Sequence, residues 1–204
     1  MLDRKMFPSQ KLSATFIALL ALSLLGCDSA TPTGVDQAPV EFSTTNKATS
    51  ARYLSWNNSS GSAAFLLERQ VKGVWQATGY VNPTCTARCS DKNQGQDCRV
   101  MCGAMMPMVK TIDAGATASV SWTGKVFPSE ETHCSQGRCF RESKPEAGHY
   151  RVTVCAYDAF TCMGSPCPPT DPLFGGQPSG NKTCYSTELD VPYAQKTVLV
   201  TIKP

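Results

Sequence analysis

The chain has 204 residues, with 19 basic and 16 acidic side chains, a formal net charge of +3 and eleven cysteines. That charge is too small for the clustered basic face that phosphate binding requires, so nucleic acid is not expected as a partner. Gly, Pro, Ser and Thr are abundant and helix-periodic apolar runs are hard to find, which favours an all-β class.

The first 26 residues have the layout of a signal peptide. Arg4, Lys5 and Lys11 form a basic start, and Ser13–Leu25 follows without a charge. This apolar run is shorter than the roughly 20 residues that a membrane-spanning helix needs. Together with the small residue Gly26 it predicts an export signal over residues 1–26. The alternative is a buried helix at the N-terminus.

Leu24-Leu25-Gly26-Cys27 closes this leader and resembles the bacterial lipobox. The resemblance implies a diacylglycerol on the Cys27 sulfur and Cys27 as the mature N-terminus. Two or three acyl chains anchor a protein stably, so the lipid bilayer is the first expected partner. The expected location is the cell envelope, facing the periplasm or the surface. Asp28 resembles an inner-membrane retention signal of enteric bacteria, and the choice of membrane stays open.

Ten cysteines remain after Cys27, and their even number in an exported chain predicts disulfides. Without the leader's three basic residues and one acidic residue, the net charge is about +1. The sequence does not choose the pairing among the ten, which are Cys85, Cys89, Cys98, Cys102, Cys134, Cys139, Cys155, Cys162, Cys167 and Cys184.

Residues 27–40 contain turn formers without apolar periodicity and predict a flexible tether, of which only the last few residues could wrap on the domain. A single cysteine-rich domain is expected over residues 41–204. Its first strands are predicted at 53–56, 64–69 and 74–81, with turns at 57–61 and 72–73, so that the three form a meander.

Alternating patterns predict further strands at 108–112, 117–127, 150–157 and 195–203. Between them lie two long loops, at 128–145 and 158–193, and a cysteine-rich segment at 83–106. In the strand at 150–157, Tyr150, Val152 and Val154 share one face, so Cys155 is expected to face outward and to hold a loop.

Seven or so short strands with turn signals between them predict a β-sandwich with long disulfide-stapled loops. The strand with Trp122, followed later by Ala147-Gly148-His149-Tyr150, resembles immunoglobulin-like modules of bacterial surfaces. A similar layout occurs in bacterial proteinase inhibitors of the BsuPI type. These resemblances cover about residues 115–157 and imply an immunoglobulin-like sandwich.

The spacing Cys85-x₃-Cys89-x₈-Cys98-x₃-Cys102 allows a four-thiolate metal site, although export favours bridges, and no metal or other cofactor is expected. Four methionines near Pro107 are expected to fill a small core rather than to bind copper. His133 and His149 are the two histidines, and His149 is expected to be a solvated edge residue. No nucleophile elbow occurs, so the chain is not expected to be an enzyme. Trp56, Trp75 and Trp122 are expected in the sandwich core or in packing between strands, and not as platforms for a ligand.

The sequence therefore predicts a membrane-anchored exported lipoprotein with a binding or structural role. Protein or glycan contact is expected through loops 128–145 and 158–193, with Phe140, Phe160, Leu173 and Phe174 as anchors or, alternatively, as covers of the sandwich edges. One alternative is a proteinase inhibitor that presents residues 158–184. Another is a metal-binding or redox lipoprotein that uses the cluster from Cys85 to Cys102.

Overall fold

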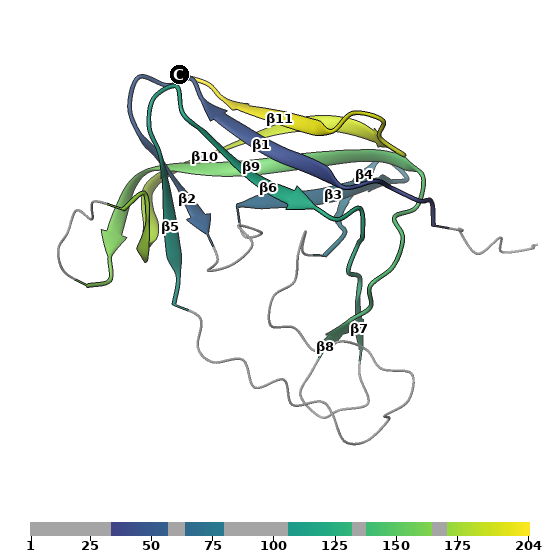
Figure 1. Ribbon diagram of the computed structural model, residues 1–204. Coiled ribbons are helices and arrows are strands. Elements are labelled where there is room, and N and C mark those ends of the chain that lie inside the picture. Colours follow the sequence, from purple (N-terminus) through teal and green to yellow (C-terminus); the bar gives the residue numbers. More distant parts are fainter. Residues whose placement is uncertain (1–33, 57–63, 80–105, 132–137, 165–170) are drawn as a thin grey trace, which may run out of the picture. The chain divides into compact units, whose positions relative to one another are not determined.

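The computed structural model describes residues 34–56, 64–79, 106–131, 138–164 and 171–204 (Figure 1). These parts of the chain contain eleven strands and no helix. The strands are β1 (Val40–Asn46), β2 (Arg52–Trp56), β3 (Phe65–Val71), β4 (Val74–Ala77), β5 (Met108–Ile112), β6 (Thr117–Trp122), β7 (Ser129–Glu131), β8 (Arg138–Phe140), β9 (Gly148–Cys162), β10 (Leu173–Val191) and β11 (Thr197–Ile202). The predicted all-β class is confirmed.

Two sheets form a sandwich, as predicted. The smaller sheet has the order β11-β1-β6, in which β1 is parallel to β11 and antiparallel to β6. The larger sheet has the order β10-β5-β2-β9-β3-β4, with an additional pairing of β10 with β9. The first and last strands of the domain therefore lie side by side in one sheet (Figure 1).

The 15-residue strand β9 organises the larger sheet. One edge of β9 pairs with β10 from Gly148 to Cys162, interrupted only by one bulge. Along the other edge lie β3, opposite residues 150–154, and β2, opposite residues 156–157. The predicted meander is therefore wrong at its first turn, because β2 and β3 follow each other along β9 instead of pairing. The β3–β4 hairpin around Lys72-Gly73 is confirmed.

The predicted loop at 158–193 is wrong for most of its length. Residues 158–162 continue β9, and residues 173–191 form β10, which runs antiparallel to β9. Gly180 and Asn181 together oppose the single residue Asp158, which is the geometry of a β-bulge. Gly180 has φ 76°, which suits glycine, and the Asp158 carboxylate accepts hydrogen bonds from the Asn181 N–H at 2.8 Å and Nδ2 at 2.7 Å.

Four strand segments close into a small circuit, because β9 pairs with β2 and β10, and β5 pairs with both β2 and β10. Aromatic rings gather here: Phe160 lies 4.7 Å from Tyr53 and 5.0 Å from Phe174 between ring centroids. Phe174 and Val109 are buried outside the main core. Phe174 was expected as an exposed anchor, and that prediction is wrong; the alternative, that it covers the sandwich edge, fits.

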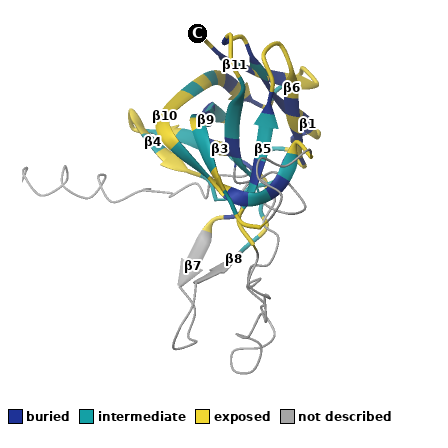
Figure 2. Cartoon of the chain, turned by 90° about the vertical axis from the view of Figure 1, so that its left-hand side faces the viewer, coloured by how far each residue is buried: buried dark blue, intermediate teal, exposed yellow. Residues whose placement is uncertain are grey.

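The main core lies between the two sheets, and Figure 2 shows the buried residues as dark blue stretches along the strands. Phe42 in β1 stacks on Trp122 at 5.4 Å and approaches Phe65 of the other sheet at 6.3 Å between ring centroids. Trp122 is fully buried, as predicted, and Trp56 packs partly buried against the same core.

The first strand, β1, occupies a stretch for which no strand was predicted. Its inward positions include the polar residues Thr44 and Asn46, which are completely buried. Asn46 is satisfied there, because Nδ2 donates to the Ile112 and Ser50 carbonyl oxygens and Oδ1 accepts from the Ala48 N–H. A polar side chain that can meet its hydrogen-bond partners is tolerated inside, and here it hides the strand's periodicity.

The end of the predicted tether lies along the domain. The Val35 N–H donates to the Pro145 carbonyl at 2.7 Å, and the Gln37 side chain bonds the backbone of Tyr193 in both directions. Of the predicted loop 128–145, residues 129–131 and 138–140 form the two-stranded ribbon β7–β8. Its middle lies outside the described residues.

Candidate functional site

Six side chains form a network on the outer face of the larger sheet. Val152 and Val154 of β9 are buried, so the alternating residues His149 and Arg151 point outward. In the ladder, Arg151 lies between Glu68 of β3 and Glu188 of β10. We call the set the outer-face cluster; it consists of Glu68, Trp75, His149, Arg151, Glu188 and Asp190.

The Arg151 guanidinium is held from two sides. Its Nε and Nη2 donate to Glu68 Oε2 at 2.8 and 2.7 Å, and Thr153 Oγ1 donates to the same oxygen at 3.3 Å. Its Cζ lies 4.4 Å from the Trp75 ring centroid, a distance typical of a cation–π contact. The charge and the ring are therefore fixed relative to each other before any ligand arrives.

Both ring nitrogens of His149 have a carboxylate partner. Nδ1 lies 2.8 Å from Asp190 Oδ1, and Nε2 lies 2.8 Å from Glu188 Oε2. The hydrogen bond to Asp190 raises the pKa of His149 above its ordinary value most, and the hydrogen bond to Glu188 raises it further. The two carboxylates engage different nitrogens and do not converge on one point, and within the described residues no group of His, Cys, Asp and Glu has the geometry to hold a metal.

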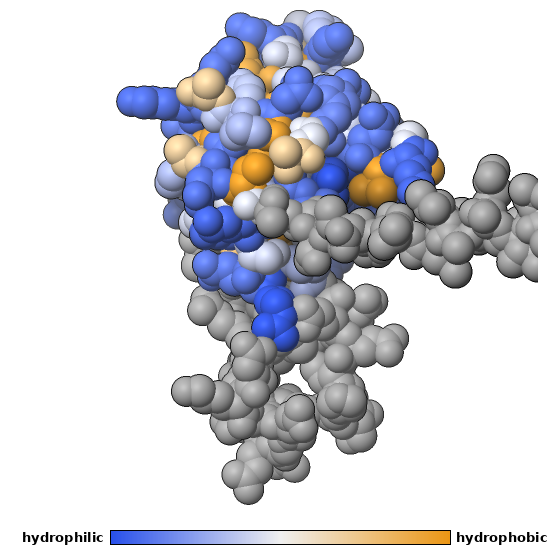
Figure 3. Space-filling view, turned by 90° about the vertical axis from the view of Figure 1, so that its right-hand side faces the viewer, coloured by the Kyte–Doolittle hydropathy of each residue, from blue (hydrophilic) through white to orange (hydrophobic). Residues whose placement is uncertain are grey.

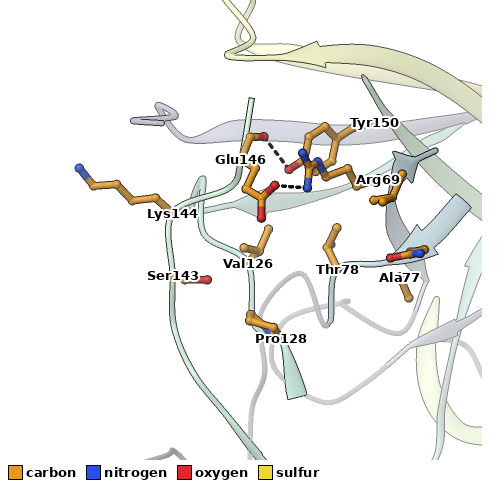
Figure 4. A pocket seen from close by; sticks show the side chains of 11 residues that line it. Arg69, Ala77, Thr78, Val126, Pro128, Ser143, Lys144, Glu146 and Tyr150 are labelled. Atoms are coloured by element: carbon orange, nitrogen blue, oxygen red, sulfur yellow. Dashed lines mark hydrogen bonds and ion pairs between the residues drawn. The ribbon is translucent and has the colours of Figure 1, made fainter. Parts of the chain in front are cut away.

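A cleft of about 200 Å³ lies at one end of the sandwich, next to β4 (Figure 4). We call it the end cleft. Arg69 of β3 and Tyr150 of β9 point toward each other at its back, and both bind Glu146. Gln76, Ala77 and Thr78 line one side, and the opposite side consists of Val126, Pro128, Ser143 and Lys144.

Tyr150 is the best-defined polar group of the end cleft. The ring is almost completely buried, and its hydroxyl donates to the Glu146 carbonyl oxygen at 2.8 Å. Burial raises the pKa of this phenol to about 12, because the phenolate would lose its hydration. Arg69 Nη1 forms an ion pair with Glu146 Oε2, while the buried Arg69 Nε has no partner.

The structure bonds Cys155 of β9 to Cys184 of β10, directly opposite in the ladder. Cys155 faces outward as predicted, but it joins two strands instead of holding a loop. Cys162 is also disulfide-bonded. Cys139 lies in β8 opposite Glu130. The other predicted site cysteines lie outside the described residues: Cys27, Cys85, Cys89, Cys98, Cys102, Cys134 and Cys167.

Two other predicted roles change with the structure. Trp75, expected in packing between strands, is instead in the outer-face cluster, and His149 is one of its central members. His133 lies outside the described residues. No pattern in the sequence indicates the cluster, because Glu68, Arg151 and Glu188 meet only through the register of three strands that are distant in sequence.

No family model matches the chain, and no curated protein and no solved structure is similar to it. Within the described residues, no helix is long and apolar enough to span a bilayer.

Proposed function

We propose that this chain is an exported lipoprotein, anchored in a bilayer through acylated Cys27, whose β-sandwich binds a ligand and does not catalyse a reaction. The lipobox-like sequence supports the anchor. The Cys155–Cys184 bridge supports export, because Cys184 is exposed and an exposed disulfide persists in oxidising compartments. The periplasm or the cell surface fits both observations.

The outer-face cluster is the observation that carries the binding role. An aromatic ring, a guanidinium, an imidazole and three carboxylates are held on one rigid sheet face by contacts of 2.7 to 4.4 Å. Such pre-organised groups bind a partner with little ordering cost. His149 is engaged at both nitrogens, which suits a fixed charge better than a general base.

A protein or a glycan is the class of ligand that fits these groups. Aromatic and arginine side chains are the usual anchors of protein interfaces, and carboxylates accept hydrogen bonds from sugar hydroxyls. The partner expected to bind residues 158–193 then contacts the outer face of β9 and β10. Residues 128–145 are a second proposed contact. Nucleic acid is not proposed, because three of the six cluster residues are acidic.

Mass spectrometry of the mature protein tests the anchor. We expect Cys27 as the N-terminal residue with a mass increase from acyl chains, and the Cys27→Ser variant should move from the membrane to the soluble fraction. An unmodified N-terminus at another residue would overturn the lipoprotein proposal while leaving the binding role untouched.

Ligand capture tests the binding role. The full chain in detergent micelles is screened on a glycan array and by photo-crosslinking to envelope extracts, with Trp75→Ala as the test variant. Leu199→Ala is the matched control, since Leu199 is an exposed apolar residue of the other sheet. Signals should fall about tenfold in Trp75→Ala only. Equal signals for both variants would refute a role for the outer-face cluster.

We also propose that the sandwich is of the immunoglobulin-like class. Tyr150, at the start of β9, donates its hydroxyl to the Glu146 carbonyl four residues upstream, which resembles the tyrosine corner of that fold. The corner of antibody domains is followed by a cysteine two residues later, where this chain has Val152. An experimental structure that covers residues 57–63 and 80–105 would test the topology.

The proteinase-inhibitor alternative has a narrower basis than the sequence suggested. Residues 159–162 pair with residues 176–179 of β10, and residues 173–175 pair with β5. This leaves the segment between Cys162, which is disulfide-bonded, and Leu173 as the part to present to a protease. An inhibition panel against common proteases tests it.

The metal or redox alternative rests on the cluster from Cys85 to Cys102. Counting free thiols in the denatured protein tests it, since a metal site predicts four free thiols.

A further inference from the structure

Among the described strands, β4 lies at the edge of the larger sheet. β4 pairs with β3 on one side, and in the described part of the chain no strand pairs with its other side. Its four residues, Val74-Trp75-Gln76-Ala77, include no charge and no proline, and Val74 has 62% of its surface exposed. Edge strands are usually protected from pairing by charged residues, by proline or by a covering segment.

The register shows which backbone groups of β4 are free. The two-residue turn Lys72-Gly73 closes on the pair Val71 and Val74. Four residues further along the chain, the Thr78 N–H donates to the Leu67 carbonyl, so every second pair along the hairpin is hydrogen-bonded. The N–H and C=O of Trp75 and Ala77 therefore point away from β3. The open edge ends at Thr78, whose carbonyl accepts the Phe127 N–H at 3.1 Å.

The edge of the smaller sheet at β11 is different. Thr187 Oγ1 donates to the Leu199 carbonyl at 2.7 Å, and Tyr185 Oη donates to the Lys203 carbonyl at 3.2 Å. Side chains of β10 thus occupy the backbone acceptors of β11. The four free groups of β4 have no such cover among the described side chains.

A strand added to β4 would meet a binding surface on each face. On the outer face lies Trp75 with Arg151, and on the other face lies the end cleft, with Gln76 at its side and Lys144 at its rim. Both cations of the end cleft already have a carboxylate partner, Arg69 in Glu146 and Lys144 in Asp36. Asp36 is exposed and lies outside the lining, so a carboxylate of a ligand can replace it beside Lys144. Figure 3 shows that apolar side chains on the viewed side form small patches in a hydrophilic surface.

We propose that β4 binds an extended peptide segment of a partner protein by strand addition, with an acidic side chain of that peptide over the end cleft beside Lys144. The backbone of Trp75 and Ala77 supplies affinity, and alternate side chains of the peptide meet the two faces. A four-residue edge is too small to reach the ~1,000 Å² that a stable dimer of two copies needs. The inference deepens the proposed binding function and rests on it.

The test uses the full chain in detergent micelles and a fluorescein-labelled peptide, Thr-Val-Thr-Glu-Thr-Val-Thr, with a second peptide that carries Lys in place of Glu. Anisotropy should show tighter binding of the Glu peptide. In hydrogen exchange, the amides of Trp75 and Ala77 should slow when the Glu peptide is added. If the hydrogen-exchange rates of both amides in the wild-type chain stay unchanged, strand addition is overturned.

Two variants separate backbone recognition from side-chain recognition. Ala77→Pro removes an outward N–H without touching the β3–β4 bonds and should weaken binding by about fivefold to tenfold. Val74→Thr, the matched control, keeps the backbone and should stay within about twofold. Equal affinities of wild type and Ala77→Pro, with both proteins folded by circular dichroism, would refute the proposal.

Charge reversal tests the acidic side chain. Lys144→Glu disturbs only the exposed ion pair with Asp36, so folding should be unaffected, and the preference should change from the Glu peptide to the Lys peptide. An unchanged preference would refute the placement beside Lys144. A doubling of mass with concentration in sedimentation, without peptide binding, would instead assign the edge to a second copy. Failure of these tests with an intact Trp75-dependent ligand signal would overturn strand addition alone.

Discussion

At the scale of single residues, Tyr150 links the core to the end cleft. Its ring is buried while its hydroxyl reaches the Glu146 carbonyl, so one side chain stabilises both the start of β9 and the segment before it. The hydroxyl bonds the backbone of Glu146, and the Glu146 side chain forms an ion pair with Arg69. Removing the hydroxyl alone isolates the hydrogen bond from the packing.

We expect Tyr150→Phe to lower the free energy of unfolding by about 1 kcal/mol, because a buried hydrogen bond is lost and the Glu146 carbonyl is left without its donor. Urea unfolding near neutral pH measures this. Tyr193→Phe is the control, since its hydroxyl bonds are exposed and longer, at 3.2 and 3.3 Å. Equal effects of the two substitutions would contradict the importance of the buried bond.

Because of Tyr150, we also expect the free energy of unfolding to fall at alkaline pH. Its pKa in the folded protein is about 12, above the ordinary 10.0, so the folded state favours the neutral phenol. The resulting stability is fully present below pH 10 and is lost as the pH rises toward 12. In Tyr150→Phe this contribution should disappear, so its stability should fall less steeply over that range than the wild type's.

His149 has the same sign of shift with a different cause. Its pKa is raised by hydrogen bonds to Asp190 and Glu188, so the stability it contributes is complete below pH ~6.5 and is lost as the pH rises through the folded-state value. An NMR titration should give a pKa above the ordinary one, and Glu188→Gln with Asp190→Asn should lower it. An unshifted His149 in the wild type would contradict the geometry at both ring nitrogens.

At the scale of elements, the bulge in the β9–β10 hairpin depends on Gly180. Its φ is 76°, and a Cβ built there would collide with Asp158 Oδ1, which accepts the Asn181 N–H. Gly73 has a similar φ of 81° but open space around it. The two glycines therefore separate the cost of backbone conformation from the cost of the collision.

We expect Gly73→Ala to cost about 1–2 kcal/mol of unfolding free energy, from the left-handed conformation alone. Gly180→Ala should cost about 1–2 kcal/mol more, because the Asp158 carboxylate must move away from Asn181. Thermal and urea unfolding of both variants measure the difference. Equal costs would show that the bulge does not depend on the close approach of Asp158.

Individual strands were predictable where one face is apolar and the other polar. The strand at 108–112 agrees with β5, and 117–127 contains β6. β10 was missed, because Gly175, Gly176, Pro178 and Gly180 suggest a loop, whereas pairing with β9 supplies the hydrogen bonds that override this local preference. β1 was missed because its last two inward positions are the polar residues Thr44 and Asn46, so the apolar alternation stops after Phe42.

The candidate site was predicted less well than the strands. Outward Cys155 followed from alternation, but its partner Cys184 required the β9–β10 register. The same holds for Arg151, which meets Glu68 across 83 residues of sequence. Contacts between distant strands depend on register, and the sequence of one strand does not contain it.

At the scale of the whole domain, the parallel pairing of β1 with β11 joins the two ends of the described fold. The compact unit runs from Thr33 to Pro204, so β1 and β11 lie near its two ends. β11 contributes Val198, Val200 and Ile202 to the core, each almost completely buried. β11 therefore completes the smaller sheet beside β1.

We expect a chain that lacks residues 197–204 to lose cooperative unfolding. The three buried side chains of β11 contribute roughly 1.5–3 kcal/mol each, which together approaches the total stability of about 5–15 kcal/mol of a typical domain. The control is a chain that begins at Thr33 and keeps β11, and it should unfold within about 0.5 kcal/mol of the full chain. Cooperative unfolding of the shortened C-terminus would show that β1 and β6 hold the smaller sheet without β11.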